Sequence, residues 1–276
     1  MLTARSLLIS ESMRNAIFFT ILFCSFAFPA SAQTLAKIES ELVGHFEKLK
    51  KASNYTGTRD YEVLGKENQA IRNALVKYGE RSDVLKFQFP KLRRYLMITT
   101  SKDGNLRTYS WDGEEGGTMH DYYNVYQFRG KSGRAHAWAE PFSESMEDRG
   151  AGAMIHDIFQ TNTPSGIVYL AVSTFIGSTS LRSESIDALK IEGEKLDRNP
   201  KVIKTRSGIT SSVSFEYDFF SVVDRPGRPI RLFSYDDTKK AFRFPVVVQD
   251  RKTPQGRVTS KSITYKFDGK YFVRMG

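Results

Sequence analysis

Cysteine is almost absent from this chain, whose 276 residues include only Cys24. This residue lies in an N-terminal segment that we expect to be removed, which would leave the mature chain with none. A chain without cysteine forms no disulfides, and it offers no thiolate for zinc binding or for covalent catalysis. Its stability therefore has to come from the packing of its core.

Recurrent signatures of enzymes and metal sites are also missing. The chain has no G-x-S-x-G nucleophile turn, no H-E-x-x-H zinc helix and no phosphate-binding P-loop. The Asp-Gly pairs at Asp103 and Asp268 lack the preceding carboxylates of an EF-hand loop. The sequence accordingly predicts no catalytic residue, no metal ligand and no cofactor.

Histidine is scarce, and the four histidines stand in no recognised motif. They are His45, His120, His136 and His156. An aspartate follows two of them, as Asp121 and Asp157. Neighbours on a strand point to opposite faces of the sheet, so such a pair can act together only at a bend. A periplasmic hydrolase that uses a histidine and a carboxylate is therefore an alternative function and not our main expectation.

The chain has one apolar run, at residues 16–28, which is shorter than the roughly 20 residues needed to span a bilayer. Arg14 precedes this run, and a small-x-small sequence at residues 30–32 follows it. A positive start, a short apolar middle and small residues at the end are typical of a secretory signal peptide. We therefore predict that residues 1–32 are a signal peptide, that the mature protein begins at Gln33, and that it is periplasmic or secreted.

Other interpretations of this segment are weaker. Ser25 interrupts the apolar run and Pro29 ends it, which disfavours a permanent membrane anchor. A lipoprotein would carry a small residue before the modified cysteine, whereas Phe23 precedes Cys24. Met13 opens the signal as well as Met1 does, so both are candidate start sites.

Acidic residues are outnumbered. The chain has 41 Lys and Arg against 31 Asp and Glu, a net charge of +10, of which +9 would remain after signal removal. This excess favours anionic surroundings such as lipid head groups, lipopolysaccharide or peptidoglycan, and makes an envelope protein or an anionic envelope polymer a candidate partner. Basic residues spread over a surface also provide solubility alone. Nucleic acid is a poor candidate, because the basic residues do not gather on one predicted helix or strand face.

Helical periodicity is confined to the N-terminal part of the mature chain. In residues 34–51, apolar side chains recur every three or four positions, at Leu35, Ile38, Leu42, Phe46 and Leu49. A second helix is expected at residues 66–78, with residues 53–64 as a loop. We assign residues 33–82 to an N-terminal helical segment.

Beyond this segment the apolar pattern alternates every two residues, which is typical of β-strands. Residues 95–111 predict a hairpin, because Asp103 and Gly104 accept the positive φ values of a tight turn. Pro90 and Pro245 indicate edge positions or bulges, since proline lacks the N–H of a sheet ladder. Further strands are expected at residues 122–128, 167–176, 186–192, 212–223, 230–235, 242–248, 262–267 and 270–274.

A short pattern, aromatic-x-aromatic-Asp, recurs in the β-rich part. Its four copies end at Asp112, Asp218, Asp236 and Asp268. Alternate residues of a strand share one face, so both aromatics of a copy would face the core while the aspartate opens a turn. We predict that residues 83–276 form a mainly β domain of antiparallel hairpins, in a propeller-like or large sandwich arrangement, preceded by two N-terminal helices.

Two segments carry a resemblance to known proteins. The first is the Ser-Trp-Asp of residues 110–112 followed by the Gly-Gly-Thr-Met-His of residues 116–120, and the second is the aromatic closing run at residues 263–273. In these segments the chain resembles a family of exported bacterial β-rich proteins of unknown function. The likeness spans residues from about 85 to 276 and implies an exported β-rich module, distantly similar to propeller-type repeats. It implies no activity and no site residues.

Two irregular stretches are the best candidates for a ligand-binding surface. Residues 130–164 form the longest, with Trp138 and Phe142 expected to be exposed, and long loops on a rigid sheet often bind ligands. The second is the proline-stiffened turn at residues 224–229. Arginines on a stiff turn can grip carboxylates or phosphates at a small ordering cost. The arginines of this second stretch and its flank are Arg225, Arg228 and Arg231.

Three classes of function remain. We favour an exported, non-catalytic binding or interaction module, because catalytic signatures are absent and long loops are present. The alternatives are the hydrolase described above and a neutralising partner of an exported toxin. No stable membrane anchor would remain after cleavage of the signal.

Overall fold

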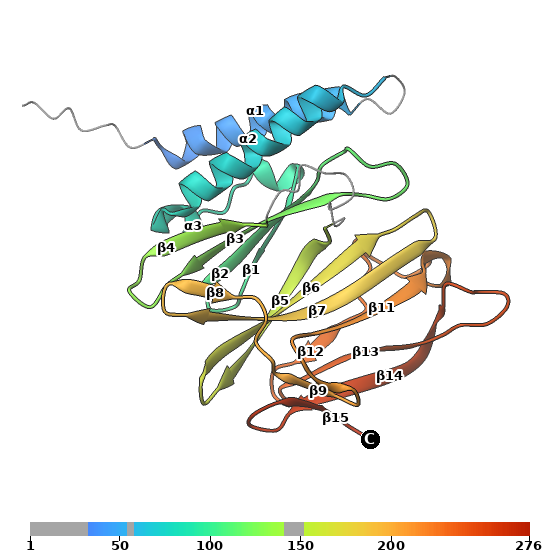
Figure 1. Cartoon of the computed structure of the whole chain (residues 1–276). Helices are drawn as coiled ribbons and strands as arrows, with labels where there is room; N and C mark the ends of the chain where they lie inside the picture. Colours follow the sequence, from blue (N-terminus) through green and yellow to red (C-terminus); the bar gives the residue numbers. More distant parts are fainter. Residues whose placement is uncertain (1–32, 54–57, 141–151) are drawn as a thin grey trace, which may run out of the picture. The chain divides into compact units, whose positions relative to one another are not determined.

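The computed structural model describes residues 33–53, 58–140 and 152–276 (Figure 1). The predicted signal peptide and Phe142 lie outside these residues. The chain is mainly β, as predicted. Within the described residues, fifteen strands form three sheets, and three α-helices precede them.

Both predicted N-terminal helices are confirmed. The first, α1, covers Leu35–Ala52, and the second, α2, covers Tyr61–Gly79. The loop expected at residues 53–64 is therefore too long, because α2 already begins at Tyr61. The carboxylate of Asp60 accepts a hydrogen bond from the N–H of Val63 (3.1 Å) and so caps the helix. The helix therefore begins five residues before its predicted start at residue 66.

The helices pack on one face of a four-stranded antiparallel sheet, sheet A. Its strands, in the order β1-β2-β3-β4, are Met97–Thr100, Leu106–Asp112, Tyr122–Arg129 and Ala135–Ala139. The predicted hairpin is confirmed as β1 and β2, with Gly104 at φ 71° in its turn. The apolar stripe of α1 is buried with Tyr109 and Trp111 of β2. Two short elements that the sequence did not predict, α3 (Ser82–Lys86) and η1 (Leu92–Arg94), lead into β1.

Sheet B has the strand order β11-β7-β6-β5. The short strand β8 pairs with the C-terminal end of β7, beyond the residues that pair with β11. These strands are β5 Met154–Thr163, β6 Gly166–Ile176, β7 Leu181–Glu192, β8 Lys195–Asp197 and β11 Ser212–Asp218. The irregular stretch predicted at residues 130–164 is wrong here, because it contains β4 and β5. β4 has no β-branched residue, and the apolar residues of β5 do not alternate regularly, so their neighbours β3 and β6 supply the pairing that the local sequence does not signal.

Sheet C has the order β10-β9-β15-β14-β13-β12, and its pairs are antiparallel except for β15 with β9. Its strands are β9 Ile203–Thr205, β10 Gly208–Thr210, β12 Ser234–Asp236, β13 Ala241–Val248, β14 Arg257–Phe267 and β15 Phe272–Arg274. The strands predicted at 212–223 and 230–235 are shorter than expected. The first ends at Asp218, where a 3₁₀ turn, η2 (Phe219–Ser221), begins.

Pro245 lies at an irregularity of β13, as its missing N–H predicts. The pairing of β13 with β14 shifts register between Pro245 and Val247. In two of the four copies of the repeated motif both aromatics are buried as predicted, at Tyr109 and Trp111 and at Tyr265 and Phe267, whereas Phe215 and Tyr235 of the other two are only half-buried. Asp268 then opens the last turn by accepting backbone N–H groups.

Sheet B buries both of its faces. On β6, Val168, Leu170 and Val172 pack with the aromatic core of sheet C. The side chains between them, Tyr169 and Ala171, pack instead with β2 and β3 of sheet A. Because successive side chains of a strand point to opposite faces, sheet B presents one set of polar residues to sheet A and another to sheet C.

Candidate functional site

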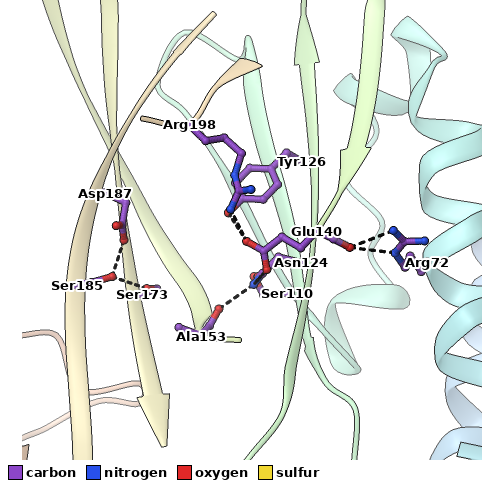
Figure 2. Close-up of polar contacts among 10 residues, drawn as sticks. All are labelled: Arg72, Ser110, Asn124, Tyr126, Glu140, Ala153, Ser173, Ser185, Asp187 and Arg198. Atoms are coloured by element: carbon purple, nitrogen blue, oxygen red, sulfur yellow. Dashed lines mark hydrogen bonds and ion pairs between the residues drawn. The ribbon is translucent and has the colours of Figure 1, made fainter. Parts of the chain in front are cut away.

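A polar cavity of about 220 Å³ lies between sheets A and B (Figure 2). It is smaller than the sites of drug-sized ligands, which span roughly 300–1,000 Å³. It therefore suits one small hydrophilic molecule. Its polar lining comprises Asn124, Tyr126 and Glu140 from the side of sheet A, and Ser173, Ser185, Asp187 and Arg198 from the side of sheet B.

The register of sheet B brings its three polar lining residues together. Ser173 on β6 pairs with Ser185 on β7, and Asp187 follows two positions later on the same face. The two serine hydroxyls lie 2.9 Å apart, and Ser185 donates a hydrogen bond to the carboxylate of Asp187. The result is a short chain of hydroxyl groups that ends on a carboxyl group.

The Asp187 carboxyl is tuned by its surroundings. Burial raises its pKa above the ordinary value, and the negative charge of Glu140 acts in the same direction. The hydrogen bond from Ser185 and the positive charge of Arg198 oppose this rise. Because burial is the largest effect, the cavity favours the neutral form of Asp187 more than water does.

Arg198 closes the cavity from the end of β8. Its Nη2 lies 2.8 Å from Oε1 of Glu140. The guanidinium stands over the rings of Trp138, at 4.2 Å from the ring centroid, and Tyr126, at 5.3 Å. Cation–π contacts with two rings restrict the plane of the guanidinium, so that its hydrogen-bond donors have a defined direction.

The opposite wall is also fixed. Asn124 donates to Oε2 of Glu140 (3.2 Å) and to the carbonyl of Ala153 (3.1 Å), and it accepts from the hydroxyl of Ser110 (2.6 Å). From α2, Arg72 donates to the carbonyl of Glu140 (3.0 Å), as Figure 2 shows. The positions of Asn124 and Glu140 are thus set by contacts outside the cavity.

No protein-family model, curated protein or solved structure matches this chain. The likeness to an exported family therefore stays a prediction that depends on the sequence motifs alone. In the described part of the chain, no helix is both long enough and apolar enough to cross a bilayer.

The residues predicted to bind ligand lie in different places. Trp138 is half-buried beneath Arg198, so it supports the cavity instead of standing in solvent. Arg228 donates to carbonyls of its own turn, at Val223, Arg225 and Gly227. Arg231 forms an ion pair with Asp157 (2.6 Å). Arg225, Arg228 and Arg231 are exposed and do not line the cavity, and Phe142 lies outside the described residues.

Every histidine contacts a carboxylate. The pairs are His45–Glu67 (2.5 Å), His120–Asp112, His136–Glu194 (2.6 Å) and His156–Asp157 (3.2 Å). The hydrogen bond that the Asp112 carboxylate accepts from the ring raises the pKa of His120. In the described ranges no three His, Cys, Asp or Glu side chains gather into a group that could hold a metal ion.

The His156–Asp157 contact corrects the expectation that strand neighbours point apart. The pairing of β5 with β6 shifts register between Ile155 and Asp157, so His156 occupies a bulge, which is the bend that such a contact requires. On its other side, His156 Nε2 lies 3.0 Å from the hydroxyl of Thr174. The Thr174 hydroxyl, the His156 imidazole and the Asp157 carboxylate thus form a continuous chain of contacts. The side chain of His156, however, has 0% exposed surface.

Proposed function

We propose that the protein is an exported, non-catalytic binding module, and that it holds one small, neutral, polyhydroxylated molecule, such as a single sugar unit, in the cavity between sheets A and B. The observation that carries this proposal is the convergence of seven polar side chains from both sheets on one small cavity. The support for export is the signal peptide predicted at residues 1–32. Absence of a catalytic motif in the sequence supports binding over turnover.

The charges of the cavity favour a neutral ligand. Glu140 and Arg198 compensate each other in an ion pair. Burial raises the pKa of Asp187, which reduces the negative charge that this carboxyl adds at a given pH. An anionic ligand would be repelled by Glu140, and a cationic ligand would be repelled by Arg198, so a charged molecule gains little on entry.

The hydrogen-bonding groups favour hydroxyls on that ligand. Ser173 and Ser185 can both donate and accept, Asp187 supplies carboxyl oxygens, and Arg198 supplies only donors. A ligand hydroxyl also donates and accepts, and it can therefore satisfy each of these groups. An apolar ligand would use none of the remaining donor and acceptor positions of these groups, so it would gain no hydrogen bond from the cavity.

For the architecture, we propose that the three sheets are stacked as layers, in a sandwich-like arrangement, and do not form propeller blades. The support is that sheet B shares one core with sheet A and another with sheet C. Blades of a propeller surround a central channel, whereas stacked sheets meet face to face. The cavity would then be a polar gap in the contact between two layers.

A hydrolase remains the second candidate, because Thr174, His156 and Asp157 have the connectivity of a nucleophile, a base and an orienting carboxylate. Burial argues against it, since Thr174 is 7% exposed and a substrate needs to reach its hydroxyl. A structural link between β5 and β6 accounts for the same contacts. Turnover of ester substrates that is abolished in Thr174→Val would favour the hydrolase.

The proposed function is tested by calorimetric titration with three matched sugars that differ in charge. These are glucose, which is neutral, glucuronate, which is anionic, and glucosamine, which is cationic. N-acetylglucosamine and inositol extend the neutral set. We expect saturable binding of at least one neutral compound and weaker binding of the charged analogues. Equal binding of glucose, glucuronate and glucosamine, or binding of none of the five compounds, would contradict the proposal.

Arg198→Ala is expected to weaken binding of such a neutral compound by about 10- to 100-fold, because a hydrogen bond to a charged group is worth roughly 1.5–3 kcal/mol. The matched control is Arg134→Ala, which removes an exposed arginine from the turn before β4. Calorimetric titration of both variants measures the dissociation constant for each, and only Arg198→Ala is expected to raise it. An equal effect of both substitutions would place the ligand elsewhere.

A further inference from the structure

The positive charge of this protein is concentrated in its last third. Residues 199–276 contain 16 Lys and Arg but only 7 Asp and Glu, whereas residues 33–198 contain 23 of each. The C-terminal segment therefore carries the whole excess of the mature chain. It forms sheet C, its connecting loops and β11.

The strands of sheet C place three of these cations on one outer face. Phe242 and Phe244 of β13 point into the core, so Arg243 between them points outward. Lys266 of β14 and Lys204 of β9 are in register with the same residue of β15, and both are exposed. We call Lys204, Arg243 and Lys266 the basic face.

Exposed apolar side chains accompany the basic face. Ile209 is opposite Lys204 in the pairing of β10 with β9, and 44% of its surface is exposed. Met275, whose N–H bonds to the carbonyl of Thr264, is 50% exposed. Cations interspersed with exposed aliphatic groups are the composition of a surface that lies on a membrane interface.

A hollow of about 350 Å³ opens beside Arg243 at the β12 edge of the sheet. Nε of Arg243 donates a hydrogen bond to the hydroxyl of Ser234 (2.9 Å). This hydrogen bond does not involve the two terminal nitrogens of the guanidinium. Lys239 and Asp236 also line the hollow, and their charges offset each other at 3.6 Å. The guanidinium of Arg243 is therefore the group at this hollow that can bind a phosphate.

We propose that the basic face docks on the surface of a bilayer that contains anionic phospholipid, with a head-group phosphate at Arg243. A lipid surface is favoured over nucleic acid because the exposed uncharged groups around the basic face are aliphatic, and single-stranded nucleic acid requires aromatic platforms for its bases. The proposal is independent of the cavity between sheets A and B. It requires neither that cavity nor its ligand.

The test is co-sedimentation of residues 33–276, which include the separate unit Thr34–Gly276, with vesicles of phosphatidylglycerol and phosphatidylcholine. Binding is expected to fall as NaCl rises from about 0.1 to 0.5 M, because salt screens exposed charges, and pure phosphatidylcholine should bind little. Each cation contributes roughly fivefold to such binding, so the triple variant K204Q/R243Q/K266Q should bind roughly 100-fold more weakly.

The matched control is K86Q/K91Q/R94Q, which removes three exposed cations near α3 and η1 and leaves the basic face intact. We expect it to bind vesicles within about threefold of the parent protein. Equal weakening of both triple variants, absence of binding to anionic vesicles, or binding to heparin alone would overturn the proposal. If the first triple variant does not fold, the single variants Arg243→Gln and Lys266→Gln carry the same test, at roughly fivefold each.

Discussion

Replacing Glu184 with Gln should stabilise the folded protein by about 3 kcal/mol at pH 7. Glu184 lies on β7, faces sheet C and has 0% exposed surface. Its Oε2 accepts the N–H of Leu232 (3.1 Å), and the hydroxyl of Tyr217 also bonds to this carboxyl group. Burial without a nearby cation raises the pKa of Glu184 to about 8, so the folded protein keeps this carboxyl protonated.

The same shift predicts how stability changes with pH. In the unfolded chain the Glu184 carboxyl loses its proton near its ordinary pKa of 4.5, whereas in the folded protein it does so near 8. Between these values the unfolded state binds fewer protons, so its free energy falls relative to the folded state as pH rises. The contribution of Glu184 to stability is therefore present below about pH 4.5 and is lost progressively up to about pH 8.

Urea unfolding at pH 5, 7 and 8.5 measures both effects. Glu184→Gln should flatten the decline in stability with pH, because glutamine does not titrate and has nearly the shape of the protonated acid. Glu216→Gln on the neighbouring strand β11 is the control, since Glu216 is exposed. Parallel pH profiles for the parent and Glu184→Gln proteins would show that Glu184 does not titrate as argued.

Replacing Arg107 with Met should destabilise the fold by about 3 kcal/mol. Arg107 lies on β2 and is only 2% exposed. Its Nη1 donates to the carbonyls of Val84 (3.1 Å) and Phe87 (2.7 Å), and its Nε donates to Thr100 (2.9 Å). The carbonyls at the end of a helix have no partner within it, so Arg107 satisfies the C-terminal end of α3.

Methionine fills a similar volume but removes the donor to the carbonyl of Phe87, whereas the carbonyl of Val84 keeps the N–H of Phe87 (3.2 Å). Thermal and urea unfolding should show the loss in Arg107→Met, and a smaller loss in Arg107→Lys, which keeps the charge but not the forked geometry. Arg94→Met removes an exposed arginine from η1 and serves as the control. A loss below about 1 kcal/mol in Arg107→Met would mean that water or another group replaces the guanidinium.

Local sequence signals were sufficient for part of this fold. The apolar stripe of α1, the Asp103-Gly104 turn and the irregularity at Pro245 each follow from neighbouring residues alone. The start of α2 was misplaced because the capping role of Asp60 depends on a single side chain within a polar stretch. β4 and β5 were missed because their stability comes from strands that lie elsewhere in the sequence.

The candidate site was beyond local prediction for the same reason. Asn124, Ser173, Asp187 and Arg198 are ordinary polar residues in four separate segments, and none belongs to a motif. Their convergence depends on the register of β6 with β7 and on the packing of sheet B against sheet A. Trp138 was predicted to be a ligand-binding residue. Its contact with Arg198 could not be predicted, because Arg198 follows β8 and lies far from Trp138 in the sequence.

The central claim is that the cavity between sheets A and B binds a small, neutral, polyhydroxylated molecule. The most direct measurement is a ¹H–¹⁵N NMR titration of the assigned protein with glucose, N-acetylglucosamine and inositol. The account predicts saturable shifts of the amides of Asn124, Ser173 and Asp187, and their loss in Arg198→Ala. Saturable shifts confined to other surfaces, such as the turn around Arg228, or the absence of saturable shifts with all three compounds, would contradict it.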